Sequence, residues 1–340
     1  MSQDGISFER ARADQAGRLA DAVDRIGRSL PALAAAGRLS GPGPVFVGIG
    51  ASHAAACGPV WQLRSRGIHS WRLGAGDYPV PFPASTHPVV GVSQSGRSSE
   101  TLAVLESIRP DLRYAVVNRV PSPVADAATV VIDLGNIPDS YASTIGYTAT
   151  VAALGMLAEA WDGGAVDPTW SELAGLLSQA EPELAAAAGE LAALFGDGRA
   201  ADFVGAGPSV GSAEAAALLF REVARVPAAA MSTRQYLHGS MESAGSGIHV
   251  LFGRDREAEV ARTLAAAGHQ AILVTDRPAG RAPNLAVVPV PDRPPAQRVI
   301  LEAQFAQVLA AEVARRRSIE IEEFVFHNSD TKVPAGMPPE

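Results

Sequence analysis

The sequence predicts an α/β protein made of two tandem, doubly wound parallel-sheet domains. Short, nearly continuous apolar runs alternate with helical patterns, which is typical of a parallel sheet covered by helices on both faces. The alternation is interrupted at Gly163-Gly164 and Pro168 and starts again near residue 200. A strand that ends in a glycine turn and leads into a helix occurs twice, at 47–52 and at 204–209. The length of 340 residues is sufficient for two domains of this kind.

The composition excludes several classes of protein. There are 28 basic and 36 acidic residues, so the net charge is −8, which argues against a nucleic-acid or anionic-membrane partner. Cys57 is the only cysteine, so neither an intramolecular disulfide nor a cysteine zinc site is expected. The first fifteen residues lack an apolar signal core, and hydroxyl residues interrupt the apolar stretch 142–160. We therefore expect a cytoplasmic globular protein. Lys332 is its only lysine.

The first half begins with a helix predicted over 7–37, where apolar residues recur at three- and four-residue spacing. Gly41-Pro42-Gly43-Pro44 then breaks the chain. The β-rich apolar runs that follow predict strands at 45–49, 69–73, 89–92, 114–117 and 130–134. The periodic segments between and after them predict helices at 52–66, 98–108 and 143–161.

The second half repeats this pattern after a helix rich in Ala and Leu, predicted over 170–195. Strands are predicted at 202–205, 227–231, 248–252, 271–275 and 285–290. Helices are predicted at 211–225, 256–267 and 295–316. We divide the chain into an N-terminal helical segment, a first domain, a linking helix, a second domain and a C-terminal tail, at 1–40, 41–165, 166–196, 197–316 and 317–340.

A loop rich in serine is the most specific local signal. Ser93, Ser95 and Ser98 lie with Gln94 and Gly96 between a buried strand and the start of a helix. Free N–H groups and a partial positive charge at a helix N-terminus bind phosphate, serine hydroxyls add neutral donors, and glycine permits close approach. The alternative is that a serine caps the helix, which would explain one hydroxyl but not three. The loop therefore predicts a phosphate site.

Other sites are not supported by the sequence. The corresponding place in the second half, 253–256, reads Gly-Arg-Asp-Arg, so the hydroxyl-rich loop exists once. There is no P-loop motif, and His53 and Val210 stand where a dinucleotide fingerprint requires its third glycine. The histidines are scattered without ligand spacing. We expect no cofactor and no metal.

The glycine turn and the serine loop together resemble the SIS (sugar isomerase) domain family. That family has a G-x-G-[TS]-S turn and an S-x-S-G-x-[ST] loop that holds a sugar phosphate, here at 48–52 and 93–98. Over about residues 40–335 the chain is similar to the isomerase half of glucosamine-6-phosphate synthase and to stand-alone deaminases, deglycases and ketose/aldose isomerases. The resemblance implies two flavodoxin-like SIS domains. It also implies a sugar phosphate bound by five side chains: Ser52, Ser93, Gln94, Ser95 and Ser98.

Three further residues match this family. They are Glu222 on the first helix of the second domain, His238 sixteen residues further on, and Lys332 in the tail. The implied roles are a proton shuttle between C1 and C2 for Glu222, ring opening for His238, and contact with C1–C2 for Lys332. Considered singly, Glu222 could pair with Arg225, His238 could be a hydrogen-bonded turn residue, and Lys332 could be solvated.

The chain departs from its relatives at a few positions. Ile145 stands where they have Lys, Ser240 where they have Pro, and Ala51 where Thr or Ser is commoner. The sequence has no cysteine near its first residue, so glutamine-dependent amino transfer is not expected. The favoured function is deamination of an amino-sugar 6-phosphate or aldose–ketose isomerisation. The alternatives are a non-catalytic sugar-phosphate sensor and a deglycase of phosphorylated fructosamines. The resemblance also implies a homodimer.

Overall fold

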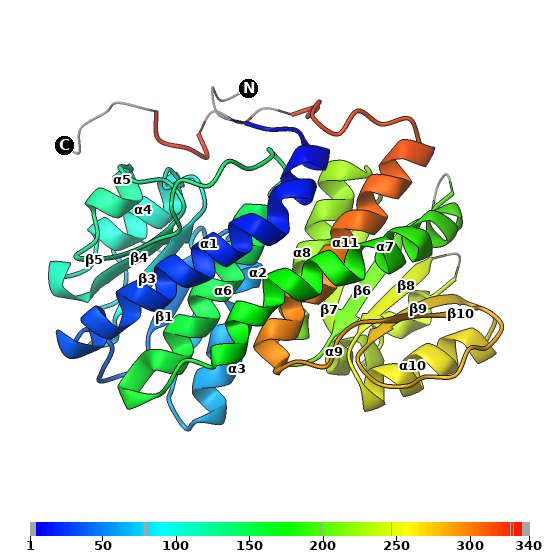
Figure 1. Ribbon diagram of the computed structural model, residues 1–340, viewed down its shortest axis with the longest axis horizontal. Helices are drawn as coiled ribbons and strands as arrows, with labels where there is room; N and C mark the ends of the chain where they lie inside the picture. The colour runs from blue at the N-terminus through cyan, green and yellow to red at the C-terminus, as the bar shows by residue number, and fades with distance from the viewer. Residues whose placement is uncertain are drawn as a thin grey trace. The chain divides into compact units, whose positions relative to one another are not determined.

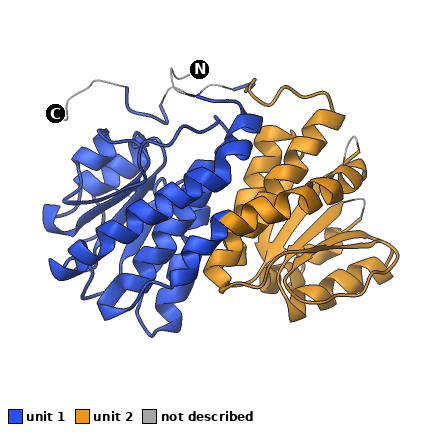
Figure 2. Ribbon diagram, viewed as in Figure 1, with its two compact units in different colours: residues 1–174, 325–340 blue, residues 175–324 orange. Residues whose placement is uncertain are grey.

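The fold is seen in a computed structural model, which describes residues 5–77, 80–196, 199–245, 247–326, 328 and 330–334. It contains two five-stranded parallel sheets flanked by helices (Figure 1), so the predicted α/β class with two doubly wound sheets is confirmed. The chain divides into two compact units (Figure 2): unit 1 comprises residues 1–174 and 325–340, and unit 2 comprises 175–324. None of the helices in the described part of the chain is long and apolar enough to cross a membrane.

The sheet of unit 1 has the strand order β2-β1-β3-β4-β5. Its strands are β1 (Val45–Gly48), β2 (Trp71–Gly74), β3 (Val89–Ser93), β4 (Arg113–Val117) and β5 (Val130–Asp133). Every residue of β1 and β3 is buried, which explains why these strands read as continuous apolar runs. Because the chain goes from β1 to one neighbour and then to the other, the topological switch point lies between β1 and β3.

The helices of unit 1 cover both faces of this sheet. They are α1 (Phe8–Ala35), α2 (Ala51–Ala55), α3 (Cys57–Ser65), α4 (Ser99–Glu106), α5 (Pro123–Asp126) and α6 (Ile145–Ala160). The apolar stripe of α1 packs against α6, and every residue of α6 except Glu159 is buried. Two short helices, α2 and α3, replace the single helix expected over 52–66 because the chain turns at Ala56.

Unit 2 has the strand order β10-β9-β8-β6-β7, which is the same topology. Its strands are β6 (Ala201–Gly205), β7 (Ala228–Ser232), β8 (Ile248–Phe252), β9 (Gln270–Thr275) and β10 (Leu285–Pro289). Its helices are α8 (Ser209–Val223), α9 (Thr233–Leu237), α10 (Asp255–Ala266) and α11 (Pro295–Arg316), and α7 (Leu173–Leu191) crosses the division between the units. Short 3-10 helices occur at Pro110–Leu112, Trp161–Gly163, Pro168–Glu172, Ala192–Leu194 and Ser240–Ser243.

Two short helices were not expected from the sequence. In α5, the Ser122 hydroxyl accepts from the N–H of Ala125 and Pro123 occupies the first turn; in α9, the Ser232 hydroxyl accepts from the N–H of Gln235. Both capping serines are visible in the sequence. The helices themselves are too short to show a 3.6-residue period.

Candidate functional site

The glycine turn and the serine loop of unit 1 meet at the switch point of its sheet. The turn follows β1 and the loop follows β3, and these strands are paired neighbours. A side chain at Gly48 would be crowded, since an added Cβ would lie 3.0 Å from the Cβ of Ser52 and 3.2 Å from the carbonyl oxygen of Val92. Ligands of doubly wound sheets bind at this place, beyond the carboxyl ends of the strands.

The serine hydroxyls of the loop are not used as helix caps. Ser98 is the N-cap residue of α4, yet its side chain accepts no hydrogen bond from the first-turn N–H groups. Its hydroxyl instead donates to Glu100 Oε2 (3.2 Å) and accepts from Thr101 Oγ1 (3.1 Å). The Ser95 hydroxyl accepts from the N–H of Arg97 (3.3 Å), and Ser93 is buried at the end of β3. The capping alternative therefore does not account for Ser98.

Gln94 lies against the N-terminus of α6, a neighbouring part of the same site. A Cβ on Gly146 would come within 2.7 Å of Gln94 Cγ. The buried carboxylate of Asp139 already satisfies this helix end, accepting from the Ser143 hydroxyl (2.8 Å) and from the N–H groups of Ile145 (3.2 Å) and Gly146 (2.9 Å). The first turn of α6 is thus occupied by an internal carboxylate, which leaves these N–H groups unavailable to a ligand.

The side chain of Ile145 is completely buried. This is the position where the resembled family has a lysine. The chain therefore has an apolar core residue at this position.

The C-terminal tail lies directly on the serine loop. Lys332 forms an antiparallel bridge with Ser98, and the N–H of Val333 donates to the carbonyl oxygen of Arg97 (2.9 Å). The Arg97 side chain donates in return to the Val333 carbonyl oxygen through Nε (2.7 Å), and the Ser99 hydroxyl donates to that of Asp330 (2.8 Å). The structure therefore brings Lys332 to the serine loop, although the two are far apart in the sequence.

The ammonium group of Lys332 lies 5.5 Å from the centroid of the Tyr141 ring, which is largely exposed. A cation at this distance from a ring face is attracted to it. Tyr141 and Arg97 were not singled out in the sequence, because nothing local shows that the tail returns to residues 97–99. The tail residues His327 and Ser329 lie outside the described part of the chain.

Glu222 lies in unit 2, in the last turn of α8. Its half-buried carboxyl group forms no hydrogen bond or ion pair with any residue that the structure describes. Burial raises the pKa of Glu222 to about 7. Arg225, its expected partner at i+3, has a positive φ of 50° and donates instead to the carbonyl oxygen of Glu323 (2.8 Å). A half-buried carboxyl with a pKa near neutrality has the properties of a general base.

His238 lies at the other end of the unit 2 sheet. It follows α9, which begins at the carboxyl end of β7, and its exposed side chain is adjacent to Gly239, whose φ is +126°. Helix α8 starts at the carboxyl end of β6 and runs back, so Glu222 lies about 20 Å along the helix from Ser209, near the amino ends of the strands. One copy of unit 2 therefore does not bring Glu222 and His238 together.

Comparison with known proteins supports the fold. No protein-family model matches the chain, and no curated protein matches it. The C-terminal domain of glucosamine-fructose-6-phosphate aminotransferase from Francisella tularensis matches with a TM-score of 0.75 at 15% identity, covering 94% of this chain and 99% of that one. Tagatose-6-phosphate ketose/aldose isomerase from Escherichia coli matches with a TM-score of 0.74 at 16% identity, covering 96% and 98%.

A third structure, glucosamine-6-phosphate deaminase from Thermotoga maritima, matches with a TM-score of 0.71 at 16% identity. It covers 93% of this chain and 96% of its own. These similarities extend over both units and establish a shared fold.

Proposed function

We propose that the chain is an enzyme that binds a sugar phosphate at the serine loop of unit 1 and moves a carbonyl group between C1 and C2. The observation that carries this proposal is the pairing of the Lys332 tail with Ser98 at the switch point of the sheet. That pairing joins a loop suited to phosphate with an amine suited to a carbonyl. The solved structures of the same fold act on glucosamine 6-phosphate or tagatose 6-phosphate by name, which favours this class of substrate.

The phosphate is held by neutral donors rather than by cations. Ser52, Ser93 and Ser95 supply hydroxyl groups around the turn and the loop, and Gln94 supports them. Glu100 in the first turn of α4 accepts hydrogen bonds from the Ser98 and Ser99 hydroxyls. The negative charge of Glu100 is favourable at the helix N-terminus but repels a phosphate. When the ligand binds, the hydroxyl groups of Ser98 and Ser99 must therefore break their hydrogen bonds to Glu100 and donate to the phosphate instead.

The chemistry needs a base, an electrophile and a ring-opening group. Glu222, with its pKa near 7, takes the proton from one carbon and returns it to the other. The Lys332 amine forms an imine with the open-chain carbonyl, releasing water that later hydrolyses the imine, or stabilises the developing oxyanion. His238 transfers the proton that opens the ring. Since Glu222 and His238 are separated within unit 2, we propose a homodimer in which a second copy of the chain supplies His238.

Deamination of an amino-sugar 6-phosphate is the favoured reaction, and its test is ammonia release from glucosamine 6-phosphate. Glu222→Gln is expected to reduce turnover at least about 100-fold, because the amide cannot carry the proton. Glu190→Gln is the matched control, since Glu190 is an exposed residue of α7. If ammonia release survives in Glu222→Gln, the assignment of the base is wrong. Ketose formation from an aldose 6-phosphate with a C2 hydroxyl, such as glucose 6-phosphate, without turnover of glucosamine 6-phosphate would instead indicate an isomerase.

A non-catalytic sugar-phosphate sensor is the second candidate, and the burial of Ile145 favours it. A sensor would be stabilised against heat by sugar phosphates without converting them. A thermal-shift screen combined with a turnover assay separates the two functions. A deglycase would release an amino acid or another amine from a phosphorylated fructosamine, so the identity of the released amine separates that third function.

A further inference from the structure

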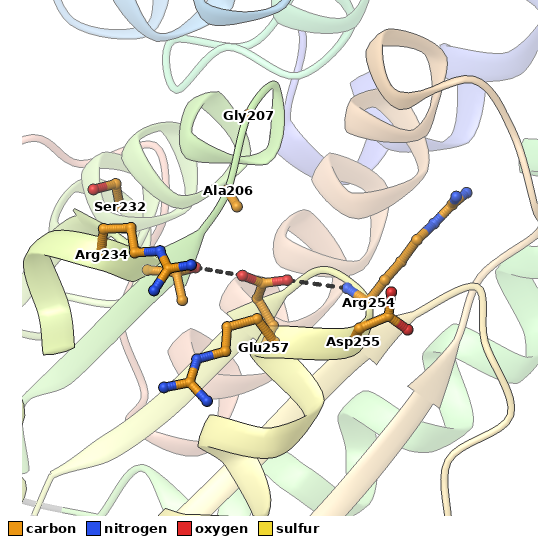
Figure 3. Close-up of a pocket in the computed structure, with 9 residues that line it drawn as sticks. Ala206, Gly207, Ser232, Arg234, Arg254, Asp255 and Glu257 are labelled. Carbon is orange, nitrogen blue, oxygen red and sulfur yellow. Dashed lines mark hydrogen bonds between the residues drawn. The ribbon is translucent and has the colours of Figure 1, made fainter.

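Unit 2 contains a cavity of about 410 Å³ beyond the carboxyl ends of β6, β7 and β8 (Figure 3). In this sheet the topological switch point lies between β6 and β8, where ligands of such sheets bind. The cavity is therefore the counterpart in unit 2 of the serine-loop site in unit 1. Its volume is that of a small-molecule site.

Arginines outnumber carboxylates in the lining of the cavity, which also includes Asp255 and Glu257. Three arginines contribute to it: Arg234 from α9, and Arg254 and Arg256 from the start of α10. Arg234 makes no hydrogen bond or ion pair with any residue in the described part of the chain. Figure 3 shows its side chain directed toward Glu257. Arg256 pairs with the exposed Glu259 (2.6 Å), a contact that solvent weakens.

The main carboxylate of the cavity is already satisfied. Glu257 is buried, accepts from the Thr233 hydroxyl (2.6 Å) and accepts from the backbone N–H of Arg254 (3.2 Å). The Arg254 side chain points away from Glu257 (Figure 3) and donates to Asp276 and to Asp292 (2.7 Å). Of the three arginines that line the cavity, Arg234 and Arg256 are thus the two whose guanidinium groups can bind an anionic ligand.

The inner part of the site is closed in unit 2. Ser209, the counterpart of Ser52, is fully buried and donates to the carboxylate of Glu302 (2.9 Å), which also accepts from Arg298 (3.0 Å). An internal anion therefore takes the position that a phosphate would occupy next to the turn. A ligand in this unit must be bound further out, where the guanidinium groups lie.

We propose that this cavity binds a phosphate group, free or carried by a small metabolite, through Arg234 and Arg256. Guanidinium groups suit phosphate because they offer several N–H donors in one plane. The site would be a second anion site in the chain, one built on guanidinium groups, whereas unit 1 uses hydroxyl groups. It does not depend on the enzymatic activity proposed above.

The test is isothermal titration calorimetry on the full chain carrying Ser93→Ala and Ser95→Ala, which disable the loop of unit 1. Inorganic phosphate and glucose 6-phosphate are titrated, with glucose as the uncharged comparison. One site per chain is expected for the two phosphate probes and none for glucose. If only glucose 6-phosphate binds, the metabolite form is the ligand; if both bind, the phosphate group suffices.

Adding Arg234→Gln and Arg256→Gln to that background should weaken binding at least about tenfold. Arg262→Gln is the matched control, because Arg262 is an exposed residue of α10 outside the cavity. Thermal melting checks folding, which substitutions of exposed arginines should leave intact. The proposal is overturned if the background binds no phosphate probe, if glucose binds equally well, or if the arginine substitutions act no differently from Arg262→Gln.

Discussion

The raised pKa that suits Glu222 to act as a base also makes the stability of the fold depend on pH. The pKa of Glu222 is about 7 in the folded chain, against a value of 4.5 for an ordinary glutamate. Between these values the native state holds a proton that the unfolded state has lost, so the stability falls as the pH rises through this range and the loss is complete above pH 7.

Glu222→Gln should remove this pH-dependent loss. We expect the variant to be more stable than the parent at pH 8 by about 2 kcal/mol, a value reduced for partial exposure to solvent, and equally stable near pH 4.5. Urea unfolding at the two pH values measures the difference. A constant difference across the range would show that the carboxyl group ionises normally.

Lys332 is the only lysine in a chain that otherwise uses arginine, and this permits a sharp substitution. Lys332→Arg should keep the bridge to Ser98, which is made by backbone groups, and the cation near Tyr141. Arginine stays protonated and forms no imine, so turnover should fall at least about 100-fold while sugar-phosphate affinity changes little.

Steady-state kinetics and titration with the sugar phosphate separate these two quantities for Lys332→Arg. Borohydride reduction in the presence of substrate should trap an adduct on the parent chain but not on the variant. Unchanged turnover in Lys332→Arg would mean that the amine is not used and that the single lysine reflects composition alone.

The sequence identified candidate site residues better than it identified the contacts that these residues make. The three serines and Gly96 could be recognised because they are adjacent in the chain, and Lys332 because it is unique. The partners of Lys332 could not, since Arg97 and Tyr141 reach it only after the tail has folded back. The burial that raises the pKa of Glu222 is likewise a property of packing, while its i+3 spacing to Arg225 suggested an ordinary ion pair.

At the scale of the element, the serine loop depends on the backbone at Gly96. Its φ is +65°, and a Cβ there would overlap the side chain of Ser122, which caps α5. Gly96→Ala should therefore cost about 1–3 kcal/mol of stability and displace the loop, with loss of sugar-phosphate binding.

The matched control is Gly17→Ala, because Gly17 lies in α1 with nothing within 4 Å of an added Cβ. Alanine in a helix should leave binding unchanged and add about 0.5–1 kcal/mol of stability. Chemical denaturation and sugar-phosphate titration of both variants provide the comparison. If Gly96→Ala binds like the parent, the loop does not hold the ligand.

At the same scale, the long helices and the strands could be predicted from the sequence because their apolar residues follow a clear pattern. Every strand and every helix of eight or more residues lies close to an expected segment, since burial on both faces or on one stripe leaves a repeated pattern. The short helices α5 and α9, and the break that divides α2 from α3, depend on single caps and turns. The pairing of residues 330–333 with 97–99 leaves no pattern at all, because it is a contact between distant segments.

At the scale of the whole molecule, the two units share one topology but differ in the side chains that are available to a ligand at the switch point of each sheet. The second glycine of each turn, Gly50 and Gly207, has nearly the same positive φ, 59° and 57°. Beyond the turn the units diverge: Ser52 makes no side-chain hydrogen bond with a described residue, while Ser209 is bound by Glu302. The repeated turn was visible in the sequence, but the internal carboxylate that closes the second site was not.

The separation of Glu222 and His238 predicts how two chains would cooperate. If the candidate site takes Glu222 from one copy and His238 from another, Glu222→Gln and His238→Gln homodimers should both be inactive. A mixed dimer contains one Glu222→Gln chain and one His238→Gln chain. One of its two sites combines the intact Glu222 of the second chain with the intact His238 of the first, so this site is functional, whereas the other site carries both substitutions. Equal mixing with random exchange gives half mixed dimers, so about a quarter of the parent activity should return.

The measurement is turnover after unfolding and refolding the two variants together, compared with the variants refolded separately and then combined. Differently tagged chains and light scattering establish that mixed dimers have formed. Recovery only in the co-refolded sample would show that the site is shared between chains. Mixed dimers without activity would place both groups in a site made by one chain, which the distance along α8 argues against.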